Sequence, residues 1–533
     1  VAFGTLGDPN LYSTFSYLAQ AVAEIVPEVT VETVAGITAM QDLASRAGIS
    51  LAEGTEPVTL VPLNGGIAAL DQALARGGAV VGYKVGAAAS PAPAVLAGRL
   101  QAAGRLDTAV IGARLGLPGE LIAPAAQLLR PAPPAPATPP APPAIPPEFN
   151  ESGALPNRFG REPLSTESPA SPQADIPDIP YLSTLIVPAL RAADIGAGLT
   201  ARPSETQAPP EPKVTAIPPG ASNLNHGDVT SPWSEPRQSH IAVVGEGTEA
   251  GEQRTKTTPA RDGSRSTGRV VFVGAGPGAP DLLTQRGACA IAAADIVIWA
   301  SSLVDQRILA HAKSGAEIVD SAQLPMEGVL PYYESAARHN LTVARVHSGD
   351  PSLWGAVQEQ LEQCAELGLD TEIVPGVSSF TAVAAAIQRE LTIPEVAQSV
   401  ILTRLGGGKT PMPPGEQVRE FARHGTTMAL FLSAARSGQL QEELLQGGYP
   451  EDTPCVVAYQ VTWPDELIIR TRLDTLAATV RHRKLWKHTL VLVGPALQTT
   501  GTRSHLYHPG HFHGYRKAEP QARKRLRDTK GKS

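Results

Sequence analysis

The chain has few of the residues that mark several classes of protein. Only three of its 533 residues are cysteine. Cys289, Cys364 and Cys455 show no metal-ligand spacing, which argues against a disulfide framework and fits a reducing compartment. No apolar run approaches the ~20 residues that span a bilayer, and the first residues lack the basic start and cleavage site of an export signal. We therefore expect a cytoplasmic protein without a membrane anchor.

An excess of positive charge is also missing. The formal net charge of -7 argues against a general nucleic-acid binder. The last stretch, residues 501–533, is basic and contains four histidines: His505, His508, His511 and His513. These histidines have no carboxylate or cysteine companion, so we expect no metal site and interpret the stretch as a solvated tail.

What the chain does have is enough apolar sequence for packed domains, interrupted by two polar regions. With 42% hydrophobic residues, it can hold about three domain-sized units. Residues 131–178 open with a proline-rich run that favours extended polyproline structure. Residues 191–268 are rich in Pro, Gly, Ser, Thr and charge, which predicts a disordered linker. Between them, residues 179–190 contain a β-rich segment that we expect to return to the first domain's sheet.

One motif occurs twice. Gly7-Asp8-Pro9 is followed by a second glycine turn at Gly36, 29 residues on, and Gly349-Asp350-Pro351 is followed by a second turn at Gly376, 27 residues on. Internal similarity of this kind indicates duplicated architecture. The spacing suits a βαβ crossover, in which strand ends carry ligands and glycine lets the backbone come close. We call residues 1–130 with 179–190 the first copy, and residues 269–500 the second copy.

The second copy alternates short apolar strands with helical segments, which predicts α/β units around a largely parallel sheet. A break in composition near Pro394 divides it into subdomains of residues 269–393 and 394–500, with a cleft between them. The first copy begins inside its own fold, without the Gly-Pro-Gly loop that opens the second. We therefore expect two α/β subdomains preceded by an incomplete second copy.

Two glycine-rich loops resemble nucleotide sites only in part. The run from Val273 to Gly278 nearly fits the dinucleotide fingerprint, but Pro277 removes an N–H and no ribose-binding acid follows the next strand. The run from Gly406 to Thr410 resembles a P-loop ending, but Thr403 stands where that motif needs glycine. Neither loop alone predicts a nucleotide site, although a dinucleotide-dependent oxidoreductase stays open as an alternative.

In combination, the motifs identify a family. The second copy reads Val-Gly-Ala-Gly-Pro-Gly from Val273, His-Ser-Gly-Asp-Pro-Ser-Leu-Trp-Gly from His347 and Val-Pro-Gly-Val-Ser-Ser from Val374. It resembles the tetrapyrrole methylases, and over residues 269–517 it is similar to the branch that methylates C11 of precorrin-4. The first copy resembles the precorrin-2 C20-methyltransferase branch. Family members often carry Asp where this sequence has Ala279.

The resemblance implies S-adenosylmethionine as methyl donor, held by loops at strand ends. It places the donor contacts in the second copy at Pro277, Gly349, Asp350, Leu353, Ser378, Ser379 and Leu432, and in the first copy at Gly7, Asp8, Leu11, Thr38 and Ala39. Asp350 could accept hydrogen bonds from the donor. Ser378 and Ser379 could instead cap a helix. Because a sulfonium methyl needs neither a metal nor a covalent intermediate, we nominate no general base.

The implied substrate is precorrin-4, with or without cobalt, whose carboxylates need cationic partners such as Arg404, Lys409 and Arg436. Each of these could equally be a surface charge. Trp354 and Trp463 could stack on the conjugated ring or fill core space. The resemblance also suggests a homodimer and contacts with other corrin-pathway enzymes. The alternative is a non-catalytic module in which the first copy binds precorrin or mediates dimerisation.

Overall fold

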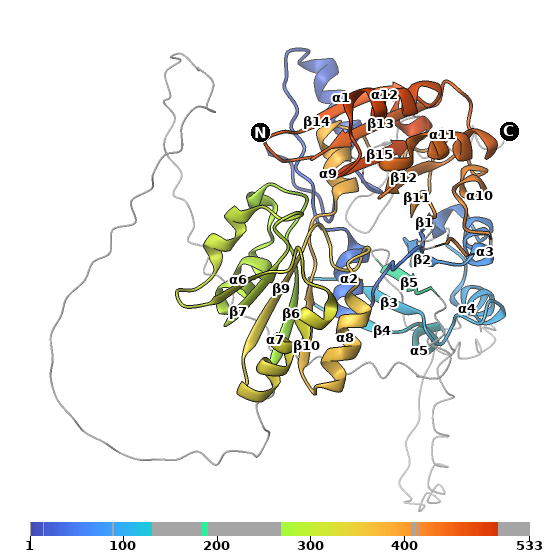
Figure 1. Ribbon diagram of the computed structural model, residues 1–533. Helices are drawn as coiled ribbons and strands as arrows, with labels where there is room; N and C mark the ends of the chain where they lie inside the picture. The colour runs from blue at the N-terminus through green and yellow to red at the C-terminus, as the bar shows by residue number, and fades with distance from the viewer. Residues whose placement is uncertain are drawn as a thin grey trace, which may run out of the picture. The chain divides into compact units, whose positions relative to one another are not determined.

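The computed structural model describes residues 2–13, 15–87, 90–129, 183–189, 268–407, 411–413 and 415–498. These residues form one sheet of five strands and one of ten (Figure 1). This mixed α/β architecture with parallel strands confirms the fold class expected from the sequence. The proline-rich insertion, nearly all of the expected linker, Lys409 and the basic tail lie outside the described residues.

The five-stranded sheet belongs to the second copy and is parallel throughout. Its order is β10-β6-β9-β7-β8. The strands are β6 (Arg269–Gly274), β7 (Ile296–Trp299), β8 (Glu317–Asp320), β9 (Thr342–His347) and β10 (Asp370–Val374). Parallel neighbours need crossover connections, which here contain α6 (Gln285–Ala293), α7 (Met326–His339), α8 (Val357–Glu366) and the 3-10 helices η2 (Pro280–Leu282) and η3 (Gln306–His311).

Alternation along the strands gives this sheet two apolar faces. On β6, Val270 and Phe272 pack with residues of α7 and α8, while Val271 and Val273 pack with residues of α6 and η3 on the other side. A parallel sheet covered on both faces needs such uninterrupted apolar strands. The result brings the carboxyl ends of β6, β9 and β10 to one edge, where the Gly-rich turns follow.

The ten-stranded sheet joins the two copies. Its order is β14-β13-β15-β12-β11-β1-β2-β5-β3-β4. The first copy supplies β1 (Val58–Pro62), β2 (Ala79–Tyr83), β3 (Val110–Ala113), β4 (Leu121–Pro124) and β5 (Ser183–Val187). The second copy supplies β11 (Val400–Arg404), β12 (Thr427–Phe431), β13 (Pro454–Tyr459), β14 (Leu467–Arg472) and β15 (Thr489–Val493). Read outward from its centre, the sheet has the same strand sequence in each copy.

The centre of this sheet is the antiparallel pair β1 and β11, in which Thr59 lies opposite Ile401. On either side, β1 runs parallel to β2 and β11 runs parallel to β12. The returning strand β5 lies between β2 and β3, just as β15 lies between β12 and β13. The two copies therefore meet edge to edge, with their strands in matching positions.

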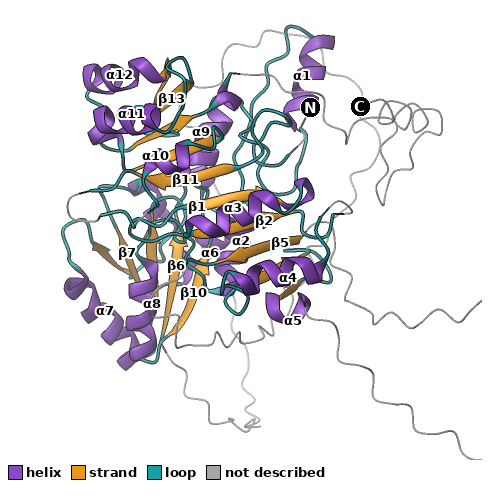
Figure 2. Cartoon of the chain, turned by 90° about the vertical axis from the view of Figure 1, so that its right-hand side faces the viewer, coloured by secondary structure: helices purple, strands orange, loops and turns teal. Residues whose placement is uncertain are grey.

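Helices cover both faces of the ten-stranded sheet (Figure 2). One face carries a separate core for each copy, with α3 (Ala68–Arg76), α4 (Pro93–Ala102) and α5 (Ala125–Leu129) over the first, and α10 (Val418–Ala422), α11 (Ser437–Gln446) and α12 (Leu476–Arg483) over the second. The other face has one shared core, to which α2 (Ala39–Ala47) and α9 (Ser379–Ala386) both contribute. The remaining elements are α1 (Phe15–Ile25), η1 (Leu63–Gly65), η4 (Ala434–Arg436), η5 (Leu473–Thr475) and η6 (Pro495–Leu497).

Local sequence explains why α2 begins and ends where it does. Thr38 is its N-cap and forms a capping box with Gln41, so the two side chains satisfy each other's backbone N–H groups. Gly48 ends the helix in the left-handed conformation, with φ of 66°. Within the described residues, no helix is long and apolar enough to cross a membrane.

Candidate functional site

Three glycines of the second copy bring the ends of β6, β9 and β10 into direct backbone contact. A Cβ added to Gly376 would lie 2.1 Å from the carbonyl oxygen of Gly349, and one added to Gly274 would lie 2.4 Å from the Gly376 nitrogen. Gly276 and Gly349 also exchange backbone hydrogen bonds of 3.2 and 2.8 Å. Only glycine fits this approach, so the repeated glycines form one junction where the three turns meet.

Asp350 ties this junction together. It is 3% exposed, and its Oδ2 accepts a hydrogen bond of 3.0 Å from the Gly376 N–H. Its Oδ1 accepts from the N–H of Ser352 at 3.0 Å and from the Ser352 hydroxyl. Burial raises the pKa of Asp350 to about 6, against the opposing effect of these hydrogen bonds. Both carboxylate oxygens thus bind groups of the protein, and Asp350 holds the two turns together.

The loop after β6 is held by a second segment, residues 460–466. The indole Nε1 of Trp463 donates a hydrogen bond of 2.9 Å to the Pro277 carbonyl oxygen. The Ala279 N–H donates to the Thr462 hydroxyl at 2.9 Å. A Cβ at Gly278 would lie 2.2 Å from the Trp463 ring. Trp463 therefore lies on the Gly-rich loop, a position that the sequence left open between ring stacking and core packing.

Beside the junction lies an aromatic pair. The rings of Trp354 and Phe431 have centroids 4.6 Å apart, and the buried Trp354 Nε1 has no hydrogen-bond partner among the described residues. Leu353 is buried, whereas Leu432 is 67% exposed and has a φ of 50°. A large apolar side chain held outward beside aromatic rings provides a surface on which a flat ligand could pack.

The two serines at the start of α9 differ from a simple capping arrangement. Ser378 is the N-cap residue and is buried, yet its hydroxyl makes no capping hydrogen bond. The Thr381 hydroxyl donates to the Ser378 carbonyl oxygen at 2.9 Å instead. Ser379, the first residue of the helix, is partly buried. The start of α9 therefore keeps a hydroxyl that helix capping does not use.

The first copy repeats part of this geometry. Oδ1 and Oδ2 of Asp8 accept hydrogen bonds of 2.9 Å from the N–H groups of Asn10 and Gly36, and burial raises its pKa to about 6. A Cβ at Gly36 would lie 2.4 Å from the carbonyl oxygen of Gly7. Among the described residues, however, this copy has no counterpart of the five-stranded sheet or of the turn at residues 274–278.

The other first-copy residues expected at a donor site have structural contacts. Leu11 is 8% exposed and belongs to the shared core. The Thr38 hydroxyl caps α2, of which Ala39 is the first residue. The Tyr12 and Tyr83 rings, with centroids 4.7 Å apart, match the Trp354 and Phe431 pair.

A family model for tetrapyrrole (corrin/porphyrin) methylases matches residues 1–128 and 269–477. The chain belongs to the tetrapyrrole methylase family. The match covers residues of both copies of this methylase, in agreement with the matching hydrogen bonds from Gly36 to Asp8 and from Gly376 to Asp350. The comparison does not separate one branch of the family from another.

Comparison with individual relatives of this methylase points to one branch of the family. The cobalt-precorrin-4 C(11)-methyltransferase of Methanocaldococcus jannaschii is 42% identical over 251 residues, which are 47% of this chain and 96% of the relative. The precorrin-4 C(11)-methyltransferase of Pseudomonas aeruginosa is also 42% identical over 251 residues, covering 99% of the relative. A solved cobalt-precorrin-4 methyltransferase is 42% identical over 43% of this chain and 96% of that chain, with a TM-score of 0.42. The two relatives from Methanocaldococcus jannaschii and Pseudomonas aeruginosa are named as methyltransferases, which gives no support to the oxidoreductase alternative.

The cations expected at the methylase's substrate site take different positions. Arg404 and Phe431 are register partners at the ends of β11 and β12, and side-chain alternation puts Arg404 on the face of Leu402 in the shared core. Its Nε is buried without a hydrogen-bond partner among the described residues. Burial, with Arg436 nearby, lowers the pKa of Arg404. Lys409 lies outside the described residues.

Unlike the Nε of Arg404, the guanidinium of Arg436 binds backbone carbonyl oxygens. Its guanidinium donates to the carbonyl oxygen of Leu405 at 2.8 Å and to that of Gly406. It therefore holds the start of the loop that carries Lys409. Contacts of this kind leave part of the guanidinium for a ligand, because Arg has five N–H donors.

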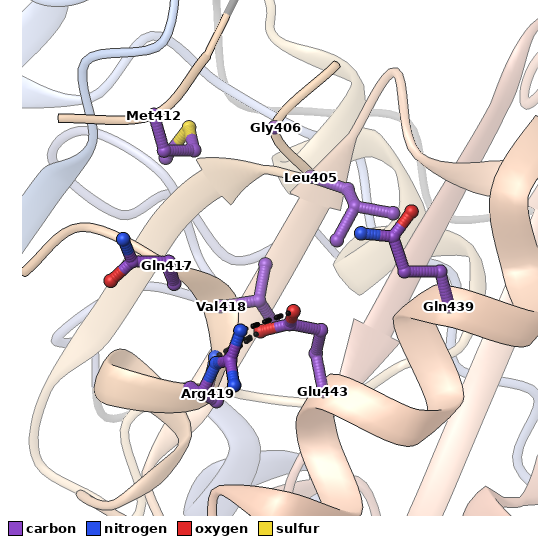
Figure 3. Close-up of a pocket in the computed structure, with 8 residues that line it drawn as sticks. All are labelled: Leu405, Gly406, Met412, Gln417, Val418, Arg419, Gln439 and Glu443. Atoms are coloured by element: carbon purple, nitrogen blue, oxygen red, sulfur yellow. Dashed lines mark hydrogen bonds and ion pairs between the residues drawn. The ribbon is translucent and has the colours of Figure 1, made fainter. Parts of the chain in front are cut away.

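A pocket of about 210 Å³ lies beside this loop (Figure 3). Leu405 and Val418, which line it, belong to the second copy's own core and not to the shared core. Arg419 and Glu443 form an ion pair of 3.1 Å within it. The pocket is therefore on the opposite face of the sheet from the aromatic pair, and we do not assign it to the methylase site.

Proposed function

We propose that the second copy transfers the methyl group of S-adenosylmethionine to C11 of precorrin-4 or its cobalt form during corrin-ring synthesis. One observation carries this proposal: residues from 268 onward contain the whole five-stranded sheet, strands β11–β15 of the ten-stranded sheet and all three glycine turns. An alignment that covers 96% of a C11-methyltransferase requires a complete copy of that kind. Relatives named for cobalt-precorrin-4 and for precorrin-4 are equally similar, so both substrates belong in the assay.

The donor site fits the residues around the glycine junction. The turns at Pro277, Gly349 and Ser378 gather beside an exposed Leu432 and the aromatic pair. Close backbone approach, an unused serine hydroxyl and an apolar platform suit a nucleoside with a charged amino-acid tail. When bound, S-adenosylmethionine supplies an electrophilic methyl group that needs no metal.

The protein contributes orientation in this mechanism. The hydrogen bond from the Gly376 N–H to Asp350 fixes the Gly-Asp-Pro turn, and the hydrogen bond from Trp463 to Pro277 fixes the loop after β6. The donor would lie between these two loops. Holding both reactants in line converts a bimolecular encounter into a unimolecular step, which can supply about 7–11 kcal/mol of the barrier. We assign no proton transfer to a side chain, because the methyl acceptor is an electron-rich ring carbon.

Substrate carboxylates would bind to Arg404, whose Nε is unpaired at the site face of β11. Lys409 and Arg436 are the further candidates, and Arg436 also donates a hydrogen bond to the carbonyl oxygen of Leu405, next to Arg404. A guanidinium is suited to this role because it binds a carboxylate through two parallel hydrogen bonds. We infer that Arg404 makes the largest contribution of the three.

The first copy resembles C20-methyltransferases, but its described residues offer no counterpart of the turn at residues 274–278. A supporting role within the chain is the second candidate function for this half. Its inter-copy contacts favour that role: β1 extends the sheet of the second copy at β11, and α2 packs into the shared core.

The test is mass spectrometry of precorrin-4 and cobalt-precorrin-4 after incubation with the full chain and S-adenosylmethionine, with precorrin-2 in parallel. We expect one added methyl group, mapped to C11, on a precorrin-4 substrate and none on precorrin-2. A methyl group at C20 of precorrin-2 would contradict the role given to the first copy. No methylation of any substrate by protein that is folded would overturn the proposed activity.

A further inference from the structure

The Gly-Asp-Pro turn of the second copy is completed by the first copy. The N–H groups of Leu51 and Ala52 donate hydrogen bonds of 2.8 and 3.0 Å to the Ser352 carbonyl oxygen. The Trp354 N–H donates in return to the Ala52 carbonyl oxygen at 2.8 Å. Residues 51–52 and 352–354 thus form an isolated parallel β-bridge between the two copies, centred on Ala52 and Leu353. Buried backbone groups need partners, and here those partners come from the other half of the chain.

The reverse contacts are made as well. The Leu391 N–H donates to the Asn10 carbonyl oxygen at 2.9 Å, and the Tyr12 N–H donates to the Thr392 hydroxyl at 2.8 Å. These residues occupy the same places in their copies as Leu51, Ser352 and Trp354. Reciprocal contacts between equivalent residues are the geometry of a two-fold dimer interface, formed here within one chain.

One contact breaks this symmetry and favours the second copy. Gln41 is fully buried, and its Nε2 donates a hydrogen bond of 2.7 Å to the Gly376 carbonyl oxygen. The N–H of Gly376 is bound by Asp350, so groups on both sides of this glycine are fixed. The equivalent residue in the second copy is Thr381, whose hydroxyl stays within its own copy by donating to Ser378.

Gln41 is well placed to hold that position. Its Oε1 accepts hydrogen bonds of 3.0 and 2.9 Å from the N–H and hydroxyl of Thr38, which fixes the side chain before it reaches the second copy. A second side chain of the first copy, the carboxylate of Glu53, accepts a hydrogen bond of 2.8 Å from the Gln358 N–H. Gln358 lies in the first turn of α8, the helix that follows the Gly-Asp-Pro turn, where negative charge is favourable.

We propose that the first copy acts as a permanent partner subunit within the chain, and that Gln41 is a positioning residue for the methyl-donor loop of the second copy. The inference rests on the proposed donor site. Without the first copy, β11 would be an unpaired edge and residues 352–354 would lose their backbone partners. The donor junction of the second copy is complete only when both copies are present.

The test uses the full chain and measures the dissociation constant of S-adenosylhomocysteine by calorimetry, followed by kcat and KM for S-adenosylmethionine. Gln41→Met removes the donor to Gly376 at nearly unchanged volume. Gln41→Glu retains the acceptor for Thr38 and is assayed at about pH 8.5, where a carboxyl ordinarily is ionised and cannot donate. The matched control is Gln388→Met, which removes a different inter-copy hydrogen bond, from exposed Gln388 to the Val31 carbonyl oxygen.

We expect both Gln41 variants to raise the dissociation constant and KM for the donor by about tenfold, the effect of one buried hydrogen bond with its desolvation penalty. The kcat of the Gln41 variants at saturating donor should stay at the wild-type value. The dissociation constant of the control, Gln388→Met, should also be unchanged. Wild-type affinity in both folded Gln41 variants would overturn the positioning role. A wild-type chain that binds no S-adenosylhomocysteine would instead refute the proposed donor site, so the two failures are distinguishable.

Discussion

The two copies share a turn but differ in what surrounds it. In both, a buried aspartate, Asp8 or Asp350, accepts hydrogen bonds from the second glycine turn. Within the part of the chain that the structure describes, the second copy alone has a five-stranded sheet and a loop that contacts Trp463. The motif by itself therefore builds the turn, and the described residues around the turn differ between the two copies. Experiments that alter equivalent residues in the two copies can test this difference.

The largest difference is expected from Gly376→Ala compared with Gly36→Ala. The added Cβ would lie 2.1 Å from a carbonyl oxygen in the second copy and 2.4 Å from one in the first, so both variants are strained. We expect Gly376→Ala to lower kcat/KM at least 100-fold, since small displacements of reacting groups have effects of that size. Gly36→Ala should mainly lower stability. Turnover per folded molecule is the measurement, and equal losses would show that the first turn takes part in the reaction.

The aspartates should instead behave alike in a pH series. Burial gives Asp8 and Asp350 pKa values of about 6, above the ordinary 3.8. The folded state then holds more protons than the unfolded state between these values, so the free energy of unfolding falls as pH rises from about 4 to 6. Asp8→Asn and Asp350→Asn should each remove no more than about 3 kcal/mol of this dependence. Urea unfolding at several pH values measures it, and an unchanged slope in either variant would contradict the assignment.

Substrate binding should depend on a cation present in one copy only. Arg404 lies beside Phe431 in register, and the matching place beside Tyr83 is held by Pro62. We expect Arg404→Met to raise KM for precorrin-4 about tenfold through loss of a charge-assisted hydrogen bond, with donor affinity unchanged. Arg419→Met, on the opposite face in an ion pair with Glu443, is the control. Equal KM values for both variants would remove Arg404 from the site.

The smallest effect concerns the aromatic residues after the two turns. The Tyr12 hydroxyl donates to the Gln398 carbonyl oxygen at 2.9 Å, whereas the equivalent Trp354 has no partner for its Nε1 among the described residues. Tyr12→Phe should lower the free energy of unfolding by about 1 kcal/mol, the usual contribution of one hydrogen bond. Chemical denaturation is the measurement. An unchanged midpoint would mean that the bond does not tie the copies together.

Much of the fold could be predicted from local sequence. Apolar strands alternating with helices indicated an α/β fold because a covered parallel sheet needs continuous apolar runs such as β6. The family resemblance rested on the combined Gly-rich motifs, and the family match agrees with it. The positions of the donor-site and substrate-site residues remain predictions, although the structure gathers Pro277, Gly349 and Ser378 around one junction.

Other features of the site could not be predicted from local sequence. Trp463 contacts a loop 186 residues away, and Gln41 reaches a glycine 335 residues away. No spacing rule connects such positions. The contact of Asp350 with the methyl donor stays a prediction, and only the folded turn shows that its oxygens also bind the backbone N–H groups of Ser352 and Gly376.

The sequence by itself determined the family, the duplication and the local elements, because glycine turns, helix caps and apolar periodicity act over a few residues. Only the tertiary structure decided that the two copies pair through β1 and β11 and that the first copy completes the turn of the second. The physical reason is that strand edges and buried backbone groups can accept any partner with suitable geometry. Which partner they take depends on the packing of the whole chain.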